Sequence, residues 1–279
     1  MSVSASWRAL FVRRFGLAVF AAIQVGGLLL PIRAAAQQPQ PTPSDTLLTT
    51  FYQDPRPERL FGFWQQFQAL PSAQSWEAYP PVAGFLAFVF RADPGQVEKL
   101  IPAKLDAKSA QTIAAALRLS GDQAMYEEFQ PRLAQAGRDD QLTGIFANLP
   151  PRLEELRIAT PSHLDILWGA AFASGDAKFV LMIIDYFART ADLDESVARD
   201  IARTLVAMAG GPTEVYAELR KRYGVLAARQ IVFAASALWA IQSNSRQHEF
   251  VARAVAKYIE DHPGTPAQKA LAATRPRAP

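Results

Sequence analysis

The chain has 279 residues, half of them hydrophobic, which is enough for a sizeable core, and it has no cysteine, so disulfides, thiolate metal sites and cysteine nucleophiles are excluded. The formal net charge is +3, but residues 1–36 hold four of the 29 basic residues and no acid, which leaves 25 basic and 26 acidic residues in the remainder. Because that remainder has no overall excess of Lys and Arg to neutralise phosphates, we expect no nucleic-acid partner.

Residues 1–36 have the three parts of a secretory signal. A basic stretch is followed by an apolar stretch from Phe15 to Ile32 and then by Ala34-Ala35-Ala36. Signal peptidase requires small side chains at the cut, so we predict cleavage between Ala36 and Gln37 and a periplasmic or secreted protein. An uncleaved anchor formed by residues 15–32 is the alternative, because that stretch is about long enough to cross a bilayer. Only in that case do we expect attachment to a membrane.

The rest of the chain divides into a spacer, one domain and a tail. Residues 37–43 alternate Pro with Gln or Thr, which favours extended polyproline geometry and predicts a spacer. From Ser44 onward the apolar residues recur at helical spacing, and this pattern predicts a single all-helical domain over residues 44–262. The Pro- and Arg-containing end predicts a disordered tail over residues 263–279.

The apolar pattern predicts an all-α fold of about ten to twelve short helices, arranged as an irregular array of antiparallel hairpins. The predicted helices lie near residues 45–53, 60–67, 82–90, 94–101, 107–119, 122–136, 161–173, 178–188, 195–208, 213–223, 225–241 and 248–260. The helix 178–188 is apolar nearly all round, so we expect it to be the central helix of the fold. We expect Gly224 to break the helix that precedes it, and Glu218 to pair with Arg222 one turn away.

One predicted hairpin resembles a tetratricopeptide repeat. Trp168-Gly169, Phe172 and the turn Gly175-Asp176 are similar to the Leu-Gly, Tyr and Gly-Asp positions of that family. The resemblance covers residues 168–187, and the second helix departs from it by carrying bulky side chains such as Phe187 where the family has alanines. The resemblance implies an α-solenoid-like hairpin protein with a concave face that binds a peptide or a protein.

No catalytic, cofactor-binding or metal-binding motif is found in the sequence. The three histidines, His163, His248 and His262, lack a second His at helical spacing, so no zinc-protease pattern exists, and we predict surface or capping roles for all three. No serine lies in a nucleophile elbow, and no glycine pattern matches a phosphate loop. We therefore predict no catalytic, cofactor or metal residues and no cofactor.

The sequence favours an exported, non-catalytic helical scaffold that binds a protein or peptide partner whose identity it does not reveal. One alternative is an enzyme with a polar site assembled from distant residues. Another is an accessory protein anchored by an uncleaved N-terminal helix. A deep pocket with perturbed carboxylates or histidines would favour the enzyme, whereas an exposed apolar groove would favour the binding protein.

Overall fold

The computed structural model describes residues 43–101, 105–210 and 214–273, and within these ranges every regular element is a helix. The α-helices are α2 (Pro43–Thr50), α3 (Leu60–Ala69), α4 (Tyr79–Ala92), α5 (Gln96–Leu100), α6 (Ala107–Ser120), α7 (Gln123–Ala134), α8 (Asp140–Phe146), α9 (Pro161–Ser174), α10 (Ala177–Ala191), α11 (Glu195–Met208), α12 (Val215–Gln247), α13 (Glu249–Asp261) and α14 (Pro266–Ala273). Five short 3₁₀ helices are η1 (Phe51–Gln53), η2 (Pro57–Arg59), η3 (Pro71–Gln74), η4 (Trp76–Ala78) and η5 (Leu153–Glu155). The predicted all-α fold is confirmed.

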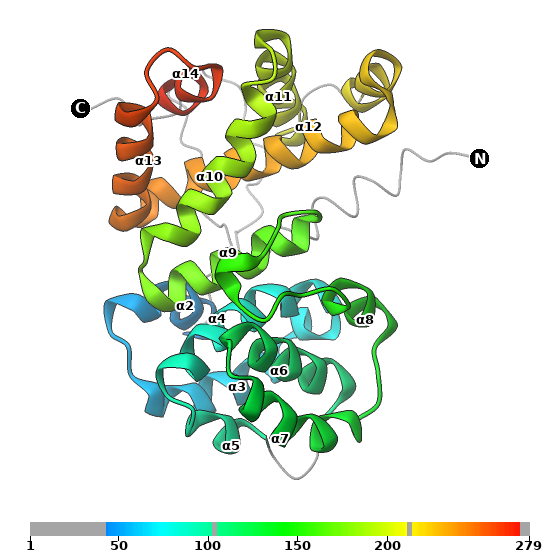
Figure 1. Cartoon of the computed structure of the whole chain (residues 1–279), viewed down its shortest axis with the longest axis vertical. Coiled ribbons are helices and arrows are strands. Elements are labelled where there is room, and N and C mark those ends of the chain that lie inside the picture. Colours follow the sequence, from blue (N-terminus) through cyan, green and yellow to red (C-terminus); the bar gives the residue numbers. More distant parts are fainter. Residues whose placement is uncertain (1–42, 102–104, 211–213, 274–279) are drawn as a thin grey trace, which may run out of the picture.

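The helices form two groups, one above the other in Figure 1. The lower group contains α2–α8, the upper group contains α10–α14, and α9 lies where the two groups meet. In the lower group α4 packs against α6 and α9, and in the upper group α12 packs against α10, α11 and α13. Because α9 contacts both α4 and α10, it joins the two groups.

The closest helix packing joins α4 to α9, which are separated in the sequence by four other α-helices. Gly84 of α4 lies directly against the backbone carbonyl of Ile166, and Gly169 of α9 lies directly against that of Pro81. A Cβ at either glycine would overlap the opposite carbonyl oxygen. A solenoid stacks each repeat on its sequence neighbours, so this packing gives the solenoid part of the prediction no support.

The helix predicted to be central is not the most enclosed one. α4 is buried over most of its length, whereas one face of α10 is open and exposes Asp185 and Arg189. The apolar run of α10 looked continuous in sequence, but Leu181 and Met182 are only half-buried. The prediction for residues 178–188 is therefore corrected: α10 borders the core on one side and a surface cleft on the other.

The sequence Ser-Gly-Asp occurs at residues 120–122 and again at residues 174–176, and it forms the same turn between two helices at both places. Gly121 ends α6 with φ +87° and Gly175 ends α9 with φ +66°, a left-handed conformation that glycine adopts without strain. The carboxylates of Asp122 and Asp176 then accept hydrogen bonds from backbone N–H groups in the first turns of α7 and α10. This local chemistry explains why the helix boundaries could be predicted here.

The predicted disordered tail is corrected for residues 266–273. These residues form α14, with Ala267 and Leu271 fully buried against α10, α11 and α13. The backbone N–H of Ala267 also donates to the carboxylate of Asp192 at the end of α10. The two buried residues are one turn apart. Because so short an apolar pattern is flanked by prolines, the sequence did not indicate a helix here. Residues 274–279 lie outside the described part.

The predicted pair of Glu218 with Arg222 is also corrected. Glu218 accepts a hydrogen bond from Arg203 at 2.6 Å, and Arg222 donates to Asp200 at 3.0 Å, so both residues of α12 bind α11 instead. Asp200 is buried and accepts a further hydrogen bond from the Tyr223 hydroxyl. A buried carboxylate requires such partners, and this need outweighs a pair between two exposed side chains on one helix.

Candidate functional site

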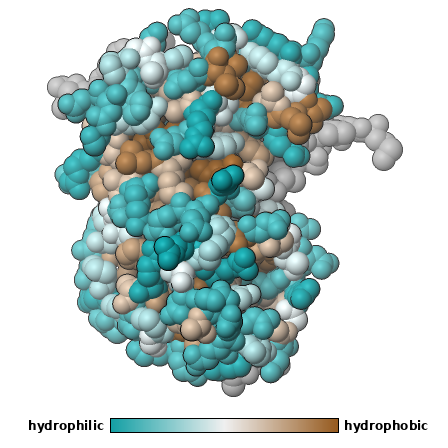
Figure 2. Space-filling view, in the orientation of Figure 1, coloured by the Kyte–Doolittle hydropathy of each residue, from teal (hydrophilic) through white to brown (hydrophobic). Residues whose placement is uncertain are grey.

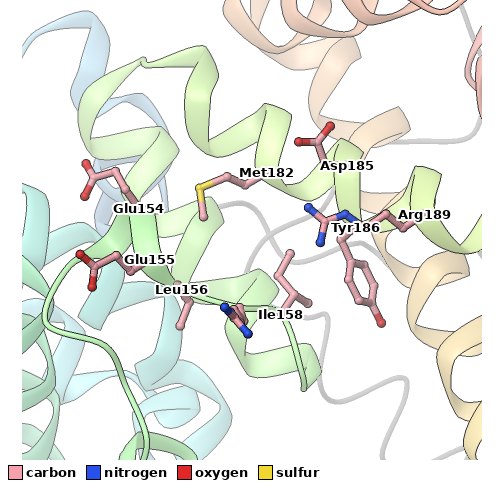
Figure 3. A pocket seen from close by; sticks show the side chains of 9 residues that line it. Glu154, Glu155, Leu156, Ile158, Met182, Asp185, Tyr186 and Arg189 are labelled. Carbon is pink, nitrogen blue, oxygen red and sulfur yellow. The ribbon is translucent and has the colours of Figure 1, made fainter.

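A surface cleft with a volume of about 610 Å³ lies between α10 and the segment that precedes α9. Figure 3 shows the side chains of the segment and those of α10 that line it. The lining residues are Glu154, Glu155, Leu156, Arg157, Ile158, Met182, Asp185, Tyr186 and Arg189. The cleft is therefore built by η5, by the irregular chain that follows it and by the open face of α10.

Glu154 fixes the start of the segment wall. Its carboxylate accepts two hydrogen bonds from Arg91 of α4, at 2.7 and 3.2 Å, and lies 3.1 Å from the ammonium group of Lys178. Arg91 also donates to the carbonyl of Ser120 at the end of α6. The hydrogen bonds from Arg91 lower the pKa of Glu154 to about 2, so the carboxylate is ionised at any physiological pH.

His163 fixes the far end of the same wall. Its Nδ1 atom lies 3.1 Å from the backbone nitrogen of Ala159 and 2.9 Å from the carbonyl oxygen of Arg157. One tautomer accepts a hydrogen bond from Ala159 and the other donates one to Arg157, so either tautomer holds the segment. Burial lowers the pKa of His163, which favours the neutral ring. The capping role predicted for His163 is thus a hydrogen bond to the chain before α9.

The floor of the cleft is apolar and its segment wall has free backbone donors. In the segment wall Leu156 is buried and Ile158 is half-buried, and on α10 Met182 is half-buried. Within the described residues, the backbone N–H groups of Arg157 and Ile158 donate to no protein acceptor. Two backbone donors of the wall therefore have no acceptor among the described residues.

The rim of the cleft carries charges of both signs. Glu155 and Arg157 lie on the segment, Asp185 and Arg189 lie on α10, and all four are exposed. None of them forms an ion pair with another residue in the described ranges. Burial raises the pKa of Tyr186 to about 12, so its phenol remains a hydrogen-bond donor. These groups are available to a ligand.

The strongest pKa shift among the carboxylates of the cleft does not prepare a group for proton transfer. No His, Ser, Thr or Lys is among the lining residues of the cleft, and the carboxylate with the strongest pKa shift, Glu154, is held ionised rather than poised to transfer a proton. In the part of the chain that the structure describes, no group of three or more His, Asp or Glu residues is placed to hold a metal ion. The arrangement suits binding.

The surface role predicted for His248 is wrong, and although His248 occupies the N-cap position of α13, its side chain makes no capping hydrogen bond. His248 is 5% exposed at the junction of α12 and α13, and its ring centroid lies 4.8 Å from that of Phe172. Its Nδ1 atom is 3.1 Å from the hydroxyl oxygen of Tyr52. His262 is exposed, stacks on Tyr258 and hydrogen-bonds its carbonyl, in keeping with the prediction. The predicted cleavage site, Ala36 and Gln37, lies outside the described residues.

Protonation of His248 should destabilise the fold in mild acid. Burial lowers the pKa of His248 from 6.5 to about 4, whereas in the unfolded chain the imidazole keeps its ordinary pKa. The contribution to the free energy of unfolding should be fully present above about pH 6.5 and should fall by roughly 3 kcal/mol as the pH decreases to about 4. Urea unfolding at a series of pH values measures this loss.

The matched variant is His248→Gln, which does not titrate but keeps a polar group near the Tyr52 hydroxyl. Its free energy of unfolding should depend less on pH over the same range, with a remaining slope from His163. If the variant and the native protein had the same pH profile, His248 would not be the group responsible.

Comparisons of the chain with protein-family models, with curated proteins and with solved structures find no match. The residues of the cleft are therefore the basis on which a function is proposed.

Proposed function

We propose that this protein is an exported, non-catalytic scaffold that binds an extended segment of a partner protein in the cleft between α10 and residues 154–158. The observation that supports the proposal most directly is the segment wall. It combines two backbone N–H groups that find no acceptor among the described residues, those of Arg157 and Ile158, with the apolar side chain of Leu156, and Met182 of α10 lines the same cleft. An extended peptide can hydrogen-bond to such a wall through its main chain and place alternate side chains on the apolar floor.

The rigidity of the wall supports the same proposal. Arg91 and Lys178 hold Glu154, and His163 holds the chain at Arg157 or Ala159, three or five residues later, so the wall is held at both ends without a ligand. Binding to an ordered surface avoids part of the entropy that is lost when a loop closes on a ligand. The charged rim would then select peptides by the sign and spacing of their own charges.

Selection of binders from a library of displayed random peptides tests this function. We expect enriched peptides to bind the purified protein and to lose at least about tenfold in affinity for Met182→Arg, which places a charge and a long side chain on the apolar floor. The control is Val206→Arg, because Val206 is an exposed apolar residue on α11 that does not line the cleft. Peptides that bind both variants as well as the native protein would contradict the proposal.

Export is a separate part of the proposal, and it is supported by the order of basic, apolar and small residues in residues 1–36. We expect the protein recovered from its native host to begin at Gln37 and to be released from the membranes when the cell envelope is washed with high salt. N-terminal sequencing of the recovered protein measures this. Retention of Met1 in a membrane fraction would favour the anchored alternative.

A further inference from the structure

The surface around the bend of α12 carries exposed aliphatic and basic side chains that do not belong to the cleft. Between Glu218 and Glu249 the chain contains five arginines and lysines and no acidic residue, namely Arg220, Lys221, Arg222, Arg229 and Arg246. Within this stretch Val225 is 52% exposed and Leu226 is 77% exposed, the largest exposure among the large hydrophobic side chains of the described residues. Figure 2 shows hydrophobic surface on the upper group of helices, over the region where Figure 1 places the start of α12.

The bend explains why two aliphatic side chains remain outside the core. Gly224 has φ 78° and ψ 172°, so the helix is interrupted there and continues in a new direction. The first part of α12 is held to α11 through Arg222 and Tyr223, which bind Asp200. The second part buries its apolar residues from Ala228 onward. Val225 and Leu226 follow the bend directly and belong to neither packed face.

The cations beside the two aliphatic side chains are not neutralised by the fold. Lys221 and Arg229 are exposed and form no ion pair with any described residue, and Arg220 only lies over the ring of Tyr216. The nearby acids are already engaged. Asp200 and Glu218 bind arginines, and Asp194, which lies near Arg222, caps α11. The surface is therefore positive and apolar at the same place.

We propose that the bend of α12, formed by residues 220–229, docks the protein onto the surface of an anionic phospholipid bilayer. Aliphatic side chains that project beside unpaired Lys and Arg match the chemistry of such a surface, because the side chains enter the acyl boundary while the cations meet the phosphates. A neutral protein partner would account for Leu226 but not for the exposed Lys221 and Arg229, which form no ion pair with a described residue.

This docking differs from spanning a membrane. Among the described helices, α12 is long and apolar enough to pass a test for a membrane span, but 56% of its apolar window is buried inside the fold. That burial is typical of a core helix, whereas the docking surface precedes the buried part. The proposal does not depend on the peptide cleft, whose lining residues lie on other elements.

Co-sedimentation of the mature protein, recovered from its native host, with lipid vesicles tests the proposal. The probes are vesicles of phosphatidylglycerol mixed with phosphatidylcholine, and vesicles of phosphatidylcholine alone. We expect tighter binding to the anionic vesicles, weakened by salt. The double variant Val225→Ser/Leu226→Ser should bind them at least tenfold more weakly. Lys221→Gln and Arg229→Gln should each lose about fivefold on the anionic vesicles only.

The control variant is Val206→Ser, which removes a comparably exposed aliphatic side chain from α11 and should bind like the native protein. Because the substituted positions are exposed, the variants should keep their helical spectrum. The proposal is overturned if the double variant binds anionic vesicles as tightly as the native protein does. It is also overturned if the double variant instead lowers the mass of the protein in sedimentation, which would show that the surface joins two copies of the chain.

Discussion

Gly84→Ala should lower the free energy of unfolding by about 3 kcal/mol or more, a large part of the roughly 5–15 kcal/mol that stabilises a typical domain. The added methyl group would overlap the backbone carbonyl of Ile166, and a backbone atom cannot move aside as a flexible side chain can. α4 and α9 would have to separate, which would disturb the packing at the centre of the molecule. Gly169→Ala should have the same effect through its contact with Pro81. Thermal or urea unfolding measures both variants.

The same substitution at Gly144 provides the control. Gly144 lies in α8, and a Cβ there would have no atom within 4 Å outside its own helix. Because alanine favours a helix over glycine by up to about 1 kcal/mol, Gly144→Ala should leave the protein as stable as before or slightly more stable. Equal stability losses at positions 84 and 144 would contradict the close contact of Gly84 in α4 with the backbone of α9.

Trp168→Ala should lower the free energy of unfolding by about 3–5 kcal/mol, because it removes a large buried side chain and leaves a cavity. Trp168 is 4% exposed on α9 and its indole stacks on Phe172, with 5.6 Å between the ring centroids. Among the described residues, the indole Nε1 atom has no hydrogen-bond partner. The contribution of this residue is therefore its apolar volume, and Trp168→Phe should recover most of the stability.

Trp76→Ala is the comparison for Trp168→Ala. Trp76 lies in η4 and is only half-buried at the edge of the core, so its removal should cost clearly less stability. Urea unfolding of both variants under the same conditions gives the difference. A nearly neutral Trp168→Ala would mean that the indole is exposed in solution, and Trp168 would then become a candidate ligand contact.

Local features of the sequence were sufficient to predict most helices. Ser-Gly-Asp marked two helix boundaries because glycine ends a helix in the left-handed conformation and aspartate caps the next one. Gly224 was correctly expected to interrupt its helix. Both signals act between residues that are close in the chain. The same reasoning missed α14, whose two buried side chains have little meaning until the helices that cover them are in place.

The cleft could not be predicted in the same way. Its two walls lie about thirty residues apart, and the segment wall matches no known motif. A partial signal existed on α10, where Met182, Asp185 and Arg189 fall at positions three and seven apart and mark one helix face as open to solvent. The apolar run beside them led instead to the prediction that residues 178–188 form the central helix of the fold.

The sequence by itself determined where most helices begin and end, α8 and α14 excepted, since capping, glycine conformation and apolar spacing depend on neighbours in the chain. Only the tertiary structure decided which helices touch. It placed Gly84 against α9, brought Tyr52 to a buried His248, and directed Arg222 to Asp200 rather than to Glu218. Burial and pairing of this kind depend on residues that are distant in sequence, and the desolvation of a polar group has no counterpart in a local pattern.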